Sequence, residues 1–204
     1  MKKHSEKLTP YFSFVTLGAA LFLAGCGTAL TGSTPAALDT VTLSADTSST
    51  STRKYSSQIL ITEPKALKIY DSQNIVVATS ATGLEYLGGT QWADRLPNLV
   101  QIKLAEALQN AGFAGVGLPG QGLAIDYQLI TEIRDFSVRI DGGDRARVSI
   151  FVKLLNDRNG DVVASRAFEA GVPAQTSSYP AALDAAFAIV TSDIVAWVAK
   201  GISR

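Results

Sequence analysis

Polar and apolar residues alternate most clearly in Arg145-Ala146-Arg147-Val148-Ser149-Ile150-Phe151-Val152-Lys153-Leu154. Apart from Phe151, every second position is apolar and the positions between are charged or hydroxylated. Because successive side chains of a strand point to opposite faces of its sheet, this pattern predicts a strand with one buried face and one face in water. The buried face of such a strand has to pack against a second layer of secondary structure.

More strands are predicted on both sides of this stretch. Upstream, residues 125–140 carry apolar side chains whose parity changes near residues 132–135, which indicates a bulge or bend. Downstream, Asn159-Gly160 is typical of a hairpin turn, and residues 162–170 are the expected returning strand. Shorter strands are expected at residues 59–61, 75–78 and 84–87. The Gly-rich residues 115–122 carry no phosphate-binding motif and are expected to be a flexible connection.

Two amphipathic helices complete the pattern. The first is predicted over residues 95–110, with Asp94 as its N-cap, Pro97 in its first turn and Gly112 at its end. The second follows Ser178 and has an apolar stripe at helical spacing: Leu183, Phe187, Val190, Ile194, Trp197 and Gly201. Strands that follow one another in sequence favour an antiparallel or mixed sheet. The expected fold is therefore α+β, with a mixed or antiparallel sheet and two helices on one of its faces.

The N-terminal segment has the features of a secretory signal. A short basic start precedes an apolar run of 13 residues, 11–23, which is shorter than the roughly 20 residues needed to span a bilayer. Leu23-Ala24-Gly25-Cys26 then resembles the lipobox of bacterial lipoproteins. That resemblance implies cleavage between Gly25 and Cys26 and acylation of Cys26, the single cysteine of the chain. A plain signal peptide with an incidental cysteine is the alternative.

These features divide the chain into a signal peptide (1–25), a lipidated Cys26 with a tether (26–57), and a single α+β domain (58–204). The tether is rich in Ser, Thr, Ala and Gly, and such tracts bury too little apolar surface to offset the entropy of the chain. Residues 41–43 within it are expected to form a short docking strand. In enteric lipoproteins an aspartate after the cysteine retains the protein at the inner membrane, so Gly27 favours the periplasmic face of the outer membrane.

The composition argues against several functions. Without residues 1–25 the chain has 18 − 3 = 15 basic and 18 − 1 = 17 acidic residues, so it offers no electrostatic basis for binding nucleic acid. The only histidine, His4, leaves with the signal, which excludes Ser-His-Asp, Cys-His and His-bearing zinc sites. A His-free glycosidase that uses carboxylates such as Glu132 and Asp135 is the remaining enzymatic alternative. We expect no enzyme activity, metal or cofactor.

Three stretches of the chain resemble the ABC-type transport auxiliary lipoproteins, the PqiC-like group. They are Leu84-Glu85-Tyr86, then Gln91-Trp92-Ala93-Asp94-Arg95-Leu96-Pro97 with the helix that follows, and the hairpin over residues 154–168. The resemblance covers most of residues 38–204. Within it, Trp92, Asp94, Arg95 and Pro97 are the candidate partner-binding residues. A purely structural role, with Trp92 over the helix start and Asp94 as its cap, explains the same residue types.

The resemblance implies a fold similar to the amino-terminal domain of TolB and a role without catalysis. The expected partners are an inner-membrane permease and ATPase, and a periplasmic protein with mammalian-cell-entry (MCE) domains. The chain would dock the outer-membrane end of that system, which moves lipids between the two membranes, and self-association into a homo-oligomer is compatible with this role. The alternative is a periplasmic carrier that holds a lipid between the helices and the sheet.

Overall fold

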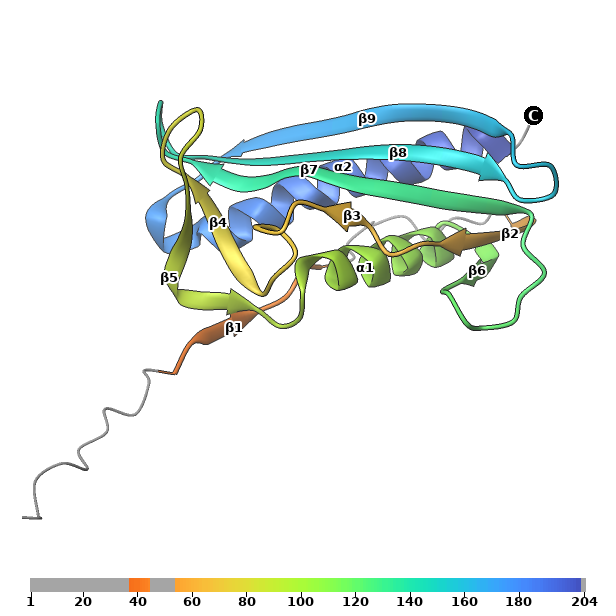
Figure 1. Ribbon diagram of the computed structural model, residues 1–204, viewed down its shortest axis with the longest axis horizontal. Helices are drawn as coiled ribbons and strands as arrows, with labels where there is room; N and C mark the ends of the chain where they lie inside the picture. The colour runs from red at the N-terminus through yellow and green to blue at the C-terminus, as the bar shows by residue number, and fades with distance from the viewer. Residues whose placement is uncertain (1–36, 45–53, 203–204) are drawn as a thin grey trace, which may run out of the picture. The chain divides into compact units, whose positions relative to one another are not determined.

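Strand β7 (Tyr127–Arg139) is the centre of the sheet, because it pairs along both of its edges. The computed structural model describes residues 37–44 and 54–202. On one edge, β7 pairs antiparallel with β8 (Arg145–Asn156), and β8 pairs antiparallel with β9 (Val162–Pro173). These three long strands form the layer that crosses the upper part of Figure 1.

The other edge of β7 is shared by three shorter strands. β2 (Tyr55–Ile61), β3 (Lys65–Ala66) and β4 (Asn74–Ala78) pair with it in turn, each in parallel orientation. β2 also pairs in parallel with β6 (Phe113–Gly117). β4 pairs antiparallel with β5 (Leu84–Trp92), whose far edge carries β1 (Asp39–Val41). Within the described residues the result is a mixed sheet of nine strands, in agreement with the predicted α+β class.

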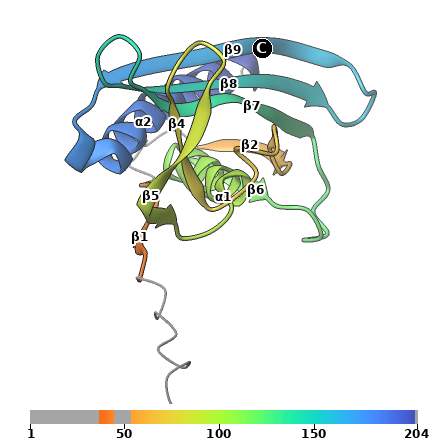
Figure 2. The same ribbon diagram turned by 60° about the vertical axis from the view of Figure 1, so that its left-hand side comes forward.

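Two long helices pack against the inner face of this sheet. α1 (Leu96–Asn110) contacts β2 and β6, whereas α2 (Tyr179–Ile202), entered through the short turn η1 (Thr176–Ser178), lies along β8 and β9. Figure 2 shows both helices below the layer of β7, β8 and β9. By length and composition alone α2 could cross a membrane. Here its predicted stripe packs on the sheet instead, with Leu183, Phe187 and Ile194 fully buried.

The core confirms the alternation that the sequence predicts for β8. Its inner-face residues are all fully buried: Ala146, Val148, Ile150, Val152 and Leu154. Aromatic rings connect the sheet to the helices. Trp92 packs edge-on against Phe136 with centroids 5.9 Å apart, and Phe136 lies 6.0 Å from Phe187 of α2. Both helices thus share one apolar core with the sheet.

The predicted bulge is present in β7. The antiparallel register with β8 shifts between Ile133 and Asp135, so that Arg134 is the additional residue. Residues before the shift alternate in one phase and residues after it in the other, and the inner face stays apolar on both sides of the shift except at Thr131. As a result Arg134 and Asp135 both lie on the outer face, the face of β7, β8 and β9 turned away from the helices.

The Gly-rich segment after α1 differs from its prediction as a flexible connection. Phe113–Gly117 forms β6, paired in parallel with β2, and the loop begins only after it. Gly115 permits this pairing, because a Cβ there would lie 2.9 Å from Cγ of Gln58. In the sequence this glycine suggests a flexible loop, but in the structure it allows two strands to approach each other closely.

Strand pairing begins well before residue 58. β1 pairs with the end of β5, and Leu43 is fully buried. The backbone N–H and hydroxyl of Ser44 both donate to the carboxylate of Asp184 on α2, at 2.7 and 2.9 Å. Residues 37–44 and 54–57 of the expected tether therefore belong to the folded unit. The cleavage and lipidation residues Gly25 and Cys26 lie outside the described residues.

Candidate functional site

The tryptophan of the predicted motif sits at the end of a strand. Trp92 is the last residue of β5, and α1 begins four residues later at Leu96. Its backbone N–H donates to the carbonyl of Gln73 at 2.7 Å, and its side chain is 1% exposed. The segment stays extended to this point because β5 continues its pairing with β4 and β1. Trp92 therefore contributes to the core and presents almost no surface to a partner.

Asp94 and Pro97 fix the turn into α1. The N-cap position is Arg95, not Asp94 as predicted, because the helix begins one residue later than expected. The Asp94 carboxylate instead binds the Asn98 amide and accepts the backbone N–H of Arg95 at 2.6 Å. These two hydrogen bonds lower the pKa of Asp94, the one from Asn98 more strongly. Pro97 is in the first turn, as predicted, and is buried.

Arg95 is the motif residue that faces solvent. Its side chain is 50% exposed and binds two carboxylates: Nε donates to Asp71 at 2.8 Å, and Nη2 lies 3.0 Å from Glu63. The hydrogen bond from Arg95, followed by that from Lys68, lowers the pKa of Asp71. The four motif residues are thus brought together as a junction between β5 and α1, with one ion-paired arginine at its surface.

A polar network on the outer face was not identified from the sequence. Asp135, placed outward by the bulge, accepts hydrogen bonds from Tyr70 at 3.2 Å and from Ser137 at 2.6 Å. The guanidinium of Arg147 lies 3.6 Å from the same carboxylate. Burial, and then the negative charge of Asp135, raise the pKa of Tyr70 to about 12. The network therefore joins the turn after β3 to two strands of the sheet.

The network continues onto β9 through a glutamate. Arg147 donates from Nη2 to Glu169 at 3.2 Å, and the hydroxyl of Ser149 donates to the other oxygen of that carboxylate at 3.0 Å. In the β7–β8 register, Ser149 stands opposite Asp135, and in the β8–β9 register it stands opposite Glu169. Adjacent strands thus place Asp135 and Glu169 on either side of Ser149 in one row of the outer face, and Arg147 in the neighbouring row binds both carboxylates.

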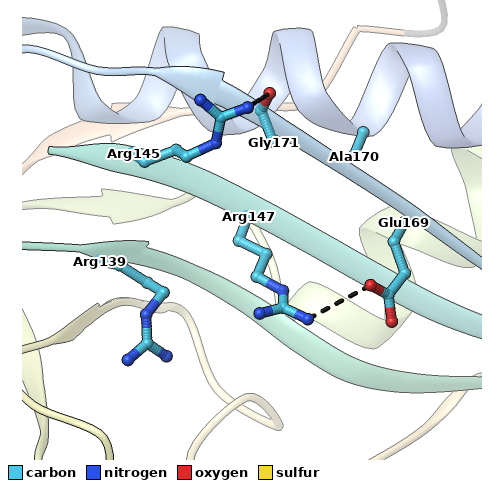
Figure 3. Close-up of a pocket in the computed structure, with 6 residues that line it drawn as sticks. All are labelled: Arg139, Arg145, Arg147, Glu169, Ala170 and Gly171. Atoms are coloured by element: carbon cyan, nitrogen blue, oxygen red, sulfur yellow. Dashed lines mark hydrogen bonds and ion pairs between the residues drawn. The ribbon is translucent and has the colours of Figure 1, made fainter. Parts of the chain in front are cut away.

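A shallow pocket of about 290 Å³ opens beside this network, near the hairpin between β7 and β8 (Figure 3). Three arginines, one glutamate and two small residues line it: Arg139, Arg145, Arg147, Glu169, Ala170 and Gly171. The side chain of Arg145 extends from β8 to β9, where its guanidinium donates to the carbonyl of Gly171 at 2.7 Å. A Cβ at position 171 would lie 2.6 Å from Nε of Arg145. The glycine therefore makes room for the arginine.

The pocket could be recognised only in part from the sequence. The alternation of β8 places Arg145 and Arg147 on the polar face, but the partners contributed by β7 and β9 depend on register. Glu132 and Asp135, considered above as a catalytic pair, bind different arginines: Glu132 pairs with Arg134 at 3.6 Å and Asp135 with Arg147. Over residues 37–44 and 54–202, no group of His, Cys, Asp and Glu is arranged to hold a metal ion.

Comparison with known families gives a direct assignment. Residues 41–195 match the model of the ABC-type transport auxiliary lipoprotein component. The chain belongs to this family. An uncharacterized protein of Bradyrhizobium diazoefficiens is 32% identical over 146 residues, which are 70% of this chain. The chain spans only 39% of the length of that relative.

Solved structures show the same fold as this auxiliary lipoprotein. The crystal structure of a DUF330 protein from Xanthomonas campestris superposes with a TM-score of 0.67 at 25% identity, over 80% of this chain and 92% of that one. A second solved structure, of an uncharacterized protein, has a TM-score of 0.62 at 17% identity, over 79% and 98% of the two chains. The family is described as an auxiliary transport component, which is not a known enzyme family, and its description as a lipoprotein indicates a membrane-anchored location in the cell envelope.

Proposed function

We propose that this chain is the lipid-anchored docking subunit of an MCE-type ABC transport system that moves lipids between the inner and outer membranes. The observation that carries the proposal is the family match over residues 41–195, downstream of a stretch ending at Cys26 that resembles a lipobox. The permease, the ATPase and a periplasmic MCE-domain protein are the proposed partners, and the proposed location is the periplasmic face of the outer membrane. A homo-oligomer would be compatible with this role.

The anchor would be the acylated Cys26. Each acyl methylene contributes about 0.8 kcal/mol to membrane binding, and stable anchoring needs about two chains. Cys26 and Ala37, where the folded unit begins, are 37 − 26 = 11 residues apart. A chain of this length spans at most about 40 Å when fully extended. The domain would thus stay close to the membrane, with its surfaces free to meet a periplasmic partner.

The outer face is the surface we propose for docking. It carries ordered charged side chains on three strands, including Arg134, Arg147 and Glu169. Charged residues of this kind steer association and select partners more than they add affinity. The inner face, by contrast, is covered by α1 and α2 and contributes to the core.

The interior gives no support to the alternative of a lipid carrier. Such a carrier would need an apolar cavity between the helices and the sheet. In that space Trp92 packs against Phe136, and Phe136 packs against Phe187, with ring centroids 5.9 and 6.0 Å apart. All three side chains are at most 1% exposed. We therefore favour an interaction subunit over a carrier.

Site-specific photocrosslinking in intact cells tests the proposal. A photoreactive amino acid would replace Arg134 on the outer face or, as the matched control, the exposed Ile189 of α2. We expect crosslinks to an MCE-domain protein from position 134, weaker ones from position 189, and recovery of the protein in the outer-membrane fraction. Cys26→Ala should release the protein from that fraction. Repeated absence of MCE peptides from both positions, with the protein at the outer membrane, would refute the docking role.

A further inference from the structure

The three arginines of the pocket are unequally neutralised. Arg139 binds Asp141 at 2.7 Å, and Arg147 binds Glu169 and Asp135. Among the described residues no carboxylate pairs with Arg145, and its guanidinium hydrogen bond goes to the carbonyl of Gly171. Arg145 therefore keeps a full positive charge and most of its N–H donors available to a ligand.

The register places this charge opposite a second arginine. Arg145 stands directly opposite Arg139 in the antiparallel pair of β7 and β8, and Asp141 neutralises Arg139. Figure 3 shows the guanidinium of Arg139 on the same side of the sheet as Arg147, with Arg145 above them beside Gly171. An anion in the pocket would neutralise the charge of Arg145.

We propose that the pocket lined by Arg139, Arg145 and Arg147 binds a phosphate group. A guanidinium presents its donors in a planar fork that matches two phosphate oxygens, and arginine is preferred wherever such two-point recognition is needed. On β9 the pocket is bordered by Gly171, where a Cβ would meet the Arg145 guanidinium, and by the backbone of Ala170, whose side chain packs against the core. A volume of about 290 Å³ suits a compact tetrahedral group better than an extended acidic peptide.

Glu169 sets the affinity of this site. Its carboxylate lines the pocket and holds Arg147 at 3.2 Å, so it repels an incoming phosphate and competes for one of the donors. Ser149 keeps the carboxylate in place through a hydrogen bond of 3.0 Å. Removal of the Glu169 charge should therefore strengthen phosphate binding, whereas removal of the Arg145 charge should weaken it. Comparison with an equal change of charge outside the pocket then distinguishes a built site from general electrostatic attraction.

The phosphate could belong to a phospholipid headgroup or be free in solution, and the chemistry of the pocket suits both. The proposal stands whether or not the chain docks to an MCE system, because it rests on the pocket alone. The test is isothermal calorimetry at constant ionic strength on the full-length lipidated protein in neutral detergent. The probes are inorganic phosphate and glycerophosphoglycerol, the deacylated headgroup of phosphatidylglycerol.

We expect Arg145→Gln to weaken binding at least tenfold and Glu169→Gln to strengthen it several-fold. Arg166→Gln is the matched control: Arg166 also has no carboxylate partner among the described residues, but it stacks on Phe168, 5.2 Å from the ring centroid, and does not line the pocket. Its loss should leave the affinity unchanged. Thermal unfolding of each variant shows whether the fold is intact.

The results distinguish a lipid headgroup from free phosphate as the source of the bound group. Tight binding of glycerophosphoglycerol with weak binding of phosphate assigns the site to a lipid headgroup, and the reverse assigns it to free phosphate. Equal losses in the Arg145 and Arg166 variants, or no binding of either probe, would overturn the proposal. Loss of partner crosslinks in Arg145→Gln with phosphate binding unchanged would also overturn it, because the pocket would then hold an acidic protein segment.

Discussion

Replacement of Trp92 by alanine tests whether the most recognisable motif of the chain serves the fold or a partner. The Trp92 side chain is 1% exposed and packs edge-on against Phe136. Its backbone N–H donates to Gln73, and the next residue, Ala93, donates its N–H to the carbonyl of Val41. The position therefore connects β5, β1 and the turn before β4. We expect Trp92→Ala to destabilise the domain strongly.

The size of the effect follows from the buried area. A tryptophan buries about 150–250 Å², which at about 25 cal/mol per Å² corresponds to about 4–6 kcal/mol. Large-to-small changes at such aromatic positions cost about 3–5 kcal/mol, out of a total stability of about 5–15 kcal/mol for a typical domain. At about 2–4 °C per kcal/mol for this chain length, the melting temperature should fall by about 6–20 °C.

The assay is thermal unfolding of the full-length protein in detergent, followed by circular dichroism. Trp197→Ala is the matched control, because Trp197 is only half-buried and touches Phe168 with ring centroids 5.7 Å apart. Its melting temperature should fall by clearly less than that of Trp92→Ala. A fall of less than about 3 °C for Trp92→Ala, together with lost partner crosslinks, would refute the structural role and place Trp92 in an interface.

Three further substitutions have defined outcomes. Gly171→Ala should change the free energy of unfolding by less than about 1 kcal/mol, because its Cβ meets the movable end of an arginine, yet calorimetry should show weaker phosphate binding. The pKa of Tyr70 is about 12 in the folded state against 10.0 in the unfolded state, which contributes about 2–3 kcal/mol of stability that is complete below pH 10 and lost as the pH rises through 12. Denaturant unfolding at pH 9 and pH 11 should show about half of this loss, and Tyr70→Phe should abolish it. Asp184→Ala should cost about 1–3 kcal/mol in urea unfolding, since it removes both bonds from Ser44, whereas Asp193→Ala, on the exposed face of α2, should cost little.

The elements that could be predicted are those whose period is visible within one segment. The stripe of α2 repeats over six positions, and β8 alternates over ten residues, so each pattern outweighs local exceptions such as Phe151. The bulge in β7 was visible for the same reason, as a change of phase in the apolar residues. A bulge leaves a trace in the sequence because the inner face must stay apolar on both sides of it.

The elements that were missed depend on partners distant in sequence. Two of the five residues of β6 are glycines, and its strand character comes from pairing with β2. The strand before α1 was expected over residues 84–87 only, whereas β5 continues through Gly88 and Gly89 to Trp92, where it pairs with β1. Pairing of this kind is a tertiary effect that overrides local preference. The same holds for Tyr70, which binds a carboxylate 65 residues away.

Substitutions of the buried motif residues and of the exposed pocket arginines have to be interpreted differently. Trp92 and Pro97 are recognisable because a fixed backbone geometry at the start of α1 requires them, so their substitution changes stability first and any partner binding only as a consequence. Arg145 is exposed, and its guanidinium hydrogen bond to the carbonyl of Gly171 leaves its charge without a carboxylate partner among the described residues. Substitution of such a surface residue can remove a function with little loss of stability. Loss of the proposed lipid transport in Arg145→Gln at an unchanged melting temperature would therefore support a functional role for the outer face, whereas the same loss in Trp92→Ala would report only on the fold.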